Sequence, residues 1–225
     1  MRPYRALLWD NDGVLVDTEG LYFQATRETL ARVGVTLTRS QYVEHFLVTN
    51  RGMEPFTEAA GGPAAIARLR AERGARYSEL LRTELVAIPG AEEVLALLTP
   101  HYRMALVTSS AREHLALAHA RTGCLRHFET IVALGDYPRS KPNPDPYEEA
   151  FRRLDLAPGE CLAIEDSRRG LLAAKAAGLG CWVVPTPLSA AAPLDEADLV
   201  LASLRELPHR LGLGARVAPL TAYAS

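Results

Sequence analysis

YRALLWDNDG, residues 4–13, joins a short apolar run to a turn that holds two aspartates. The run over residues 4–9 has the length and the continuous apolar character of a strand buried in a parallel sheet. Asp10 and Asp12 follow at its carboxyl end. Ligands of open parallel sheets bind beyond that end of the strands. The stretch therefore predicts both a sheet and the edge where its chemistry takes place.

Five further apolar runs repeat this pattern of strand, turn and helix. They cover residues 102–107, 130–134, 161–164, 181–184 and 199–201, of which the last two are weaker. The predicted helices cover residues 91–98, 112–120, 146–154 and 167–177. Gly178 follows the last of them, where a C-terminal glycine is expected. This alternation predicts an α/β fold with a Rossmann-like, doubly wound parallel sheet.

A different kind of sequence separates the first two predicted strands. Residues 18–88 are helical in pattern, rich in Arg and Glu, and contain no convincing strand. The triplet Gly61-Gly62-Pro63 breaks this region in the middle. We therefore predict a helical cap subdomain at residues 18–88, inserted into a core domain made of residues 1–17 and 89–225. The pattern after Leu207 supports no assignment.

Composition and charge narrow the class of protein. The chain of 225 residues is 48% hydrophobic and 23% charged, as in ordinary globular proteins, and its net charge is -2. We therefore expect no nucleic-acid partner, which would require a basic face. No apolar run approaches the roughly 20 residues that cross a bilayer. The start of the chain lacks the features of a signal peptide. Cys124, Cys161 and Cys181 lie far apart without the spacing of a zinc site, as expected for free thiols in a reducing compartment. We therefore expect a cytoplasmic protein without a membrane partner.

Polar residues recur where the other predicted strands end. Thr108-Ser109-Ser110 and Glu165-Asp166 follow two of the strands, and Lys141 lies in a loop before the fourth. Each group alone has a structural explanation as a turn, a helix cap or a solvated side chain. Clustered carboxylates, however, repel one another and require a cation. Lys141, one of only two lysines, supplies part of that charge and a divalent metal the rest, so together the residues predict a functional site.

The residue types indicate phosphoryl chemistry. Oxygen ligands suit Mg²⁺, which binds carboxylates together with a substrate phosphate. A carboxylate such as Asp10 can attack phosphorus and divide one difficult displacement into two. Lys141, the Thr108 hydroxyl and helix N-termini would then surround the phosphoryl oxygens. Asp12 can project to the same side and protonate the leaving oxygen, and neighbouring carboxylates should favour its protonated form.

Four motifs together resemble those of the haloacid dehalogenase-like hydrolase superfamily. They are residues 9–19, 108–109, 140–142 and 165–167, and their order and spacing agree with the family over about residues 4–190. Trp9 and Asn11 depart from the commoner apolar residues, at positions that supply no chemistry in the family. The placement of the helical insertion is similar to the α-helical cap of the β-phosphoglucomutase and phosphoglycolate phosphatase branch.

The resemblance implies which residues hold the metal and transfer the proton. Asp10 is implied as nucleophile and Mg²⁺ ligand. Asp12 is implied as the acid and base, with its backbone carbonyl on the metal. Asp166 is implied as a further metal ligand, with Glu165 on the metal or directly behind it.

The resemblance also implies which residues hold the substrate. Thr108 and the Ser109 N–H would bind the phosphoryl group, and Lys141 would neutralise it. Arg51 is similar to the cap arginine that contacts a distal phosphate or polar group in the mutase branch. Arg73 falls near a second basic cap position. If both arginines face inward, they favour an anionic or polyhydroxylated substrate such as a sugar phosphate.

Alternative activities can be weighed against single residues. Dehalogenases of the superfamily lack the second aspartate, so Asp12 argues against them. Phosphonatases use a cap lysine, and no lysine precedes Lys141. β-Phosphoglucomutase has a histidine in the first cap helix where this chain has Tyr22, which disfavours a mutase without eliminating it. A non-catalytic member that binds a phosphometabolite is a third hypothesis. The leading prediction is a Mg²⁺-dependent phosphatase for a small phosphorylated metabolite, monomeric or weakly dimeric.

Overall fold

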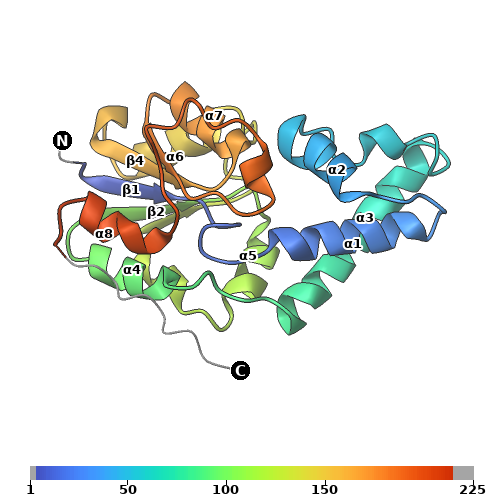
Figure 1. Cartoon of the computed structure of the whole chain (residues 1–225), viewed down its shortest axis with the longest axis horizontal. Helices are drawn as coiled ribbons and strands as arrows, with labels where there is room; N and C mark the ends of the chain where they lie inside the picture. Colours follow the sequence, from blue (N-terminus) through green and yellow to red (C-terminus); the bar gives the residue numbers. More distant parts are fainter. Residues whose placement is uncertain (1–3, 215–225) are drawn as a thin grey trace.

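The six apolar runs form one parallel sheet in the computed structural model, which describes residues 4–214 (Figure 1). The strands are β1 (Ala6–Trp9), β2 (Arg103–Val107), β3 (Thr130–Val132), β4 (Cys161–Glu165), β5 (Gly180–Val183) and β6 (Leu199–Val200). Their order is β3-β2-β1-β4-β5-β6, and all neighbours are parallel. β1 is central, because Leu8 lies in register with both Ala105 and Ala163. The predicted doubly wound α/β fold is confirmed.

Helices cover both faces of the sheet. The elements are α4 (Ala91–Leu98), α5 (Arg112–His119), α6 (Asp145–Arg153), α7 (Arg168–Ala176) and α8 (Leu207–Arg210). Leu8 packs in one cluster with Tyr147 of α6 and Leu171 of α7, whereas Leu7 packs in another with Leu95 of α4. Successive side chains of a strand point to opposite faces, so β1 is buried on both. The short α8, whose residue Leu207 is fully buried, lies in the tail for which the sequence supported no assignment.

The helical segment between β1 and β2 lies beside the sheet (Figure 1). This helical insertion, residues 19–83, contains α1 (Glu19–Ala31), α2 (Arg39–Tyr42), a π-helical turn (Val43–Val48), a 3-10 turn (Glu54–Phe56) and α3 (Pro63–Thr83). It has its own core, in which Leu30 and Leu69 pack around Tyr42. Gly61 and Gly62 adopt positive φ, and α3 begins at the following proline, as the predicted break requires. The division into core and cap domains remains a prediction.

The two segments that connect the insertion to the sheet run side by side. The Asp17 N–H donates to the Val86 carbonyl at 2.9 Å, and the Ile88 N–H donates to the Leu15 carbonyl at 2.9 Å. Val16, between these bonds, packs against residues of α1, α3 and α5 in a small junction cluster. The insertion therefore leaves and rejoins the sheet at one place. No helix within residues 4–214 combines the length and the apolar character that crossing a bilayer requires.

Candidate active site

Asp10 is fixed by the central strand. Its N–H continues the sheet by donating to the Ile164 carbonyl at 2.9 Å, and the residue is 7% exposed. The chain then turns at Gly13, which has φ +78°. A Cβ atom at Gly13 would lie 2.4 Å from Asp166 Oδ2, so only glycine lets the turn pass this close to the end of β4. The turn thus brings the carboxylates of two strand ends together.

Lys141 joins these strand ends. It is 2% exposed, and its Nζ donates to Asp10 Oδ1 at 2.8 Å, to Glu165 Oε1 at 2.6 Å and to the Val107 carbonyl at 2.9 Å. All three of its protons are therefore bonded. Burial acts to lower the pKa of Lys141, but the attraction of Asp10 and Glu165 outweighs burial and raises it. The side chain is a permanent buried cation.

Glu165 holds that ammonium in place. It is fully buried, and its Oε1 also accepts a hydrogen bond from the Tyr147 hydroxyl at 2.5 Å. Its carboxylate lies against the first turn of α7, where a Cβ atom at Gly170 would be 1.9 Å from the carboxylate carbon. A side chain at Gly170 would displace Glu165. The carboxylate also gains from the partial positive charge at a helix N-terminus.

A buried group of carboxylates has the composition of a magnesium site. Asp10, Glu165 and Asp166 each offer an oxygen within 4.8 Å of the others. Burial, Glu165 and Asp12 raise the pKa of Asp10 to about 7 against the opposing effect of Lys141. Burial, together with the charges of Asp10 and Glu165, raises the pKa of Asp166 well above its ordinary value. One ammonium thus compensates three carboxylates incompletely. An oxygen-binding divalent cation fits this donor set.

Three hydroxyl groups surround the Asp12 carboxylate, in addition to its carboxylate neighbour Asp10. Asp12 Oδ1 accepts a hydrogen bond from the Thr18 hydroxyl at 2.7 Å, and its Oδ2 accepts from Thr108 at 3.1 Å and Ser110 at 2.9 Å. Its hydrogen-bond partners are hydroxyls, and its side chain is not in the carboxylate group. Thr108 is fully buried and its hydroxyl orients Asp12. The buried Ser109 hydroxyl has no hydrogen-bond partner among the described residues, which leaves one donor free next to Ser110 in the chain.

A buried polar pair that sequence reasoning missed supports the turn from behind. Asn11 Oδ1 and His119 Nε2 lie 2.6 Å apart, and His119 Nδ1 lies 2.6 Å from the Thr122 hydroxyl. Burial lowers the pKa of His119 to about 4, so the ring is neutral at pH 7 and can donate at Nε2 while accepting at Nδ1. The pair ties the loop between the two aspartates to α5. A polar residue at a normally apolar position was the signal for it.

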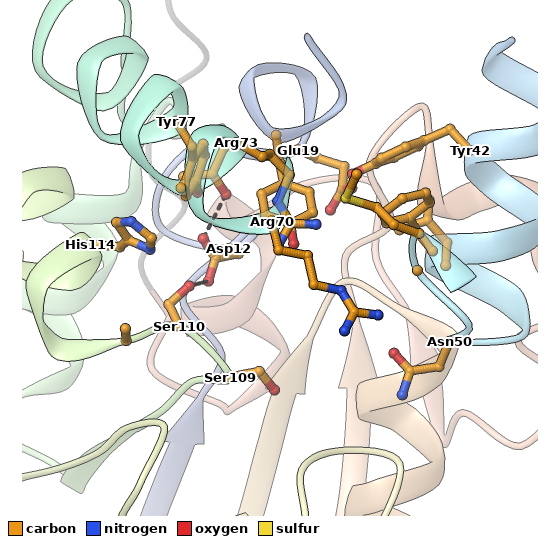
Figure 2. Close-up of a pocket in the computed structure, with 18 of the residues that line it drawn as sticks. Asp12, Glu19, Tyr42, Asn50, Arg70, Arg73, Tyr77, Ser109, Ser110 and His114 are labelled. Atoms are coloured by element: carbon orange, nitrogen blue, oxygen red, sulfur yellow. Dashed lines mark hydrogen bonds between the residues drawn. The ribbon is translucent and has the colours of Figure 1, made fainter. Parts of the chain in front are cut away.

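A cavity of about 480 Å³ lies between this edge of the sheet and the helical insertion (Figure 2). Asp12, Ser109 and Ser110 line its sheet side, whereas Asp10 is not among the lining residues. Figure 2 shows Asn50 across the cavity from Ser110. The cavity size suits a small metabolite.

The cavity is rich in arginine. Arg51 and Arg73, which the resemblance suggested, both line it, and so do Arg70 and Arg169. The Arg73 guanidinium lies 4.7 Å from the centre of the Tyr22 ring, and its buried Nε has no hydrogen-bond partner among the described residues.

Sequence reasoning missed Arg70, Arg169 and His114. The sequence does hold a signal for Arg70, because Arg70, Arg73 and Tyr77 have the i, i+3, i+7 spacing of residues on one face of a helix, here α3.

Comparison with known proteins places these features in context. Residues 7–184 match the profile of a family described as haloacid dehalogenase-like hydrolase. Protein CbbY of Cereibacter sphaeroides is 35% identical over 221 residues, covering 92% of this chain and 96% of that protein. Hexitol phosphatase B of Escherichia coli K12 is 30% identical over 226 residues, covering 95% and 98%. The structure of a CbbY mutant from Rhodobacter sphaeroides in complex with xylulose-(1,5)bisphosphate is similar, with a TM-score of 0.79, 30% identity, and coverage of 91% and 96%.

Proposed function

This chain belongs to the haloacid dehalogenase-like hydrolases and is a phosphatase of that family, and we propose that it hydrolyses a small sugar phosphate through a phosphoryl group carried on Asp10. The observation that carries this proposal is the position of Asp10, whose carboxylate accepts a hydrogen bond from the Lys141 ammonium and lies within 4.8 Å of the two other buried carboxylates. Asp12, two residues later, faces the cavity where a substrate would enter.

The residues can divide the reaction into two displacements. Lys141 bonds Asp10 Oδ1, and no described residue donates a hydrogen bond to Oδ2, so Oδ2 is free to attack phosphorus. As the new O–P bond forms, the ester P–O bond breaks and Asp12 gives its proton to the leaving alcohol. Water, deprotonated by Asp12, then attacks phosphorus, the Asp10 O–P bond breaks, and phosphate leaves with the Asp10 carboxylate restored. The unpartnered Ser109 hydroxyl and the N-terminus of α5 would bind the phosphoryl oxygens.

Magnesium is the proposed cofactor. Asp10, Asp166 and the backbone carbonyl of Asp12 would hold it, with Glu165 on the metal or directly behind it. When bound, Mg²⁺ supplies positive charge to the phosphoryl oxygens during transfer. Because one lysine leaves the carboxylates incompletely compensated, metal binding should also stabilise the fold.

Substrate recognition is assigned to the helical insertion. We propose that residues 18–88 act as a cap subdomain that closes over the sheet edge and excludes water. Arg51 and Arg73 would bind the part of the substrate away from the reacting phosphate. The mutase alternative is not favoured, because Tyr22 stands where the mutase branch has its histidine and instead packs under Arg73.

The proposal is tested with p-nitrophenyl phosphate and a panel of sugar phosphates. The wild-type protein should release phosphate with Mg²⁺, lose activity when a chelator removes the metal, and recover it when Mg²⁺ is restored. The Asp10→Asn protein should stay folded by circular dichroism and lose at least about 10³-fold in kcat. Full activity in that variant would rule out the nucleophilic role. A wild-type protein inactive on every ester would contradict the function itself.

A further inference from the structure

Two adjacent arginines at the start of α7 have different surroundings. Arg168 Nη1 donates to the Pro193 carbonyl at 2.8 Å and pairs with Glu196 at 3.1 Å. Arg169 instead lines the cavity, and its Nη1 donates to Asn50 Oδ1 at 3.1 Å. Arg169 thus reaches from the sheet side to the helical insertion. It comes from the helix that begins two residues after Asp166.

The loop that Arg169 contacts carries another cavity arginine. Asn50 and Gly52 both adopt positive φ, and between them Arg51 lines the cavity. The bond to Asn50 therefore places Arg169, from α7, next to the loop of the insertion that carries Arg51. Figure 2 shows Asn50 on the side away from His114. An ester bound beside Asp12 would extend its distal end toward this loop.

Positive charge in the cavity is incompletely compensated. Arg70 has a carboxylate partner, Glu54, at 4.0 Å. Arg51 and Arg73 form no ion pair with any carboxylate in residues 4–214. Arg169 uses one of its five N–H donors on the neutral side-chain amide of Asn50. Glu19, the cavity carboxylate that Arg169 attracts electrostatically, accepts a hydrogen bond from the Tyr42 hydroxyl. Several guanidinium donors are thus available to a ligand.

We propose that Arg169 is a specificity-determining residue that, with Arg51, binds a second phosphate at the distal end of the substrate. The preferred substrate class is then a sugar bisphosphate, and this inference rests on the proposed phosphatase function. Guanidinium groups bind phosphate through paired charge-assisted hydrogen bonds, which suits the free donors of both arginines. Because Arg169 and Arg51 come from opposite sides of the cavity, a phosphate held by both also draws the insertion onto the sheet.

The test measures inhibition of p-nitrophenyl phosphate hydrolysis by C4 to C6 sugar bisphosphates and by the corresponding monophosphates. In the wild type, the best bisphosphate should inhibit at least about tenfold more tightly than either of its monophosphates. The Arg169→Gln variant should lose about tenfold of that preference, measured as the ratio of the inhibition constants of the monophosphate and the bisphosphate. The Arg168→Gln variant is the matched control and should keep the full preference.

Each other outcome has a definite meaning. Equal inhibition by bisphosphates and monophosphates, or no inhibition by either, would overturn the inference while leaving the phosphatase function intact. The same holds if Arg169→Gln and Arg168→Gln change the preference equally, or if Arg169→Gln weakens both classes of inhibitor alike. A wild-type protein that hydrolyses neither p-nitrophenyl phosphate nor any sugar phosphate would instead reject the proposed function.

Discussion

The positive charges at the sheet edge and in the arginine-rich cavity have different partners. At the sheet edge, the Lys141 ammonium makes three hydrogen bonds, and Glu165 accepts from both Lys141 and Tyr147. In the cavity, Arg73 stacks on a tyrosine and leaves its buried Nε without a partner among the described residues. The groups at the sheet edge are thus held by hydrogen bonds within the protein, whereas arginines of the cavity keep donors that a ligand can use. Removing a cation should therefore have different costs in the two places.

The largest effect is expected at Lys141. Lys141→Met leaves Asp10 and Glu165 without their cation, which should cost about 3–5 kcal/mol of unfolding free energy. Activity should fall at least about 10³-fold, because the phosphoryl site loses a fixed positive charge. Urea unfolding and p-nitrophenyl phosphate turnover measure the two effects. Lys175→Met, which removes the only other lysine and its partly exposed pair with Asp198, should cost under about 1 kcal/mol and leave activity unchanged.

If Lys141→Met and Lys175→Met had the same free energy of unfolding, the contrast between the sheet edge and the cavity would be wrong for the sheet edge. Such a result would mean that the buried carboxylates do not depend on the ammonium for their charge balance.

A smaller effect is expected from the glycine behind Glu165. Gly170→Ala should push that carboxylate away and shift Lys141 with it, lowering kcat by about 10²-fold through misplacement alone. Gly20→Ala is the control, because a Cβ atom there meets nothing within 4 Å. That control should gain about 0.5–1 kcal/mol in stability and keep full activity. Should Gly170→Ala retain wild-type kcat, Glu165 would not be a positioning residue for Lys141.

The smallest effect is expected at Arg73. Arg73→Ala should raise KM for the best sugar phosphate about tenfold, with little change in kcat, because it removes binding to a part of the substrate that does not react. Stability should change by less than about 1 kcal/mol. Arg68→Ala, in the same helix, removes an exposed pair with Glu72 and should alter neither constant. A fall in kcat matching the rise in KM would assign Arg73 to the reaction instead of to recognition.

The sheet and the chemical edge could be predicted because their signals are local. A buried strand appears as a continuous apolar run, and parallel strands bring their carboxyl ends to one edge whatever the loops do. Asp10, Lys141 and Asp166 are therefore brought together by topology. The three hydroxyls around Asp12 could not be predicted, since the positions of Thr18 and Ser110 depend on loop conformation.

The sequence also could not predict the hydrogen bond between distant residues or the roles of individual arginines, because both depend on how separate segments pack together. Asn11 and His119 are 108 positions apart, and neither side chain alone indicates its partner. All but two of the 25 basic residues are arginines, so composition did not distinguish a cavity arginine from a surface one. Helix phase distinguishes Arg70 from Arg68, but the sequence does not show which of the adjacent residues Arg168 and Arg169 faces the cavity.

The paired connecting segments let the helical insertion leave and rejoin the sheet at one place. Asp17 and Val86 are already hydrogen-bonded neighbours, so a tight reverse turn could join them without altering any strand of the sheet. Many of the side chains that line the cavity can therefore change without disturbing the sheet, and one chemistry can be offered to different metabolites by altering a single contiguous segment of chain.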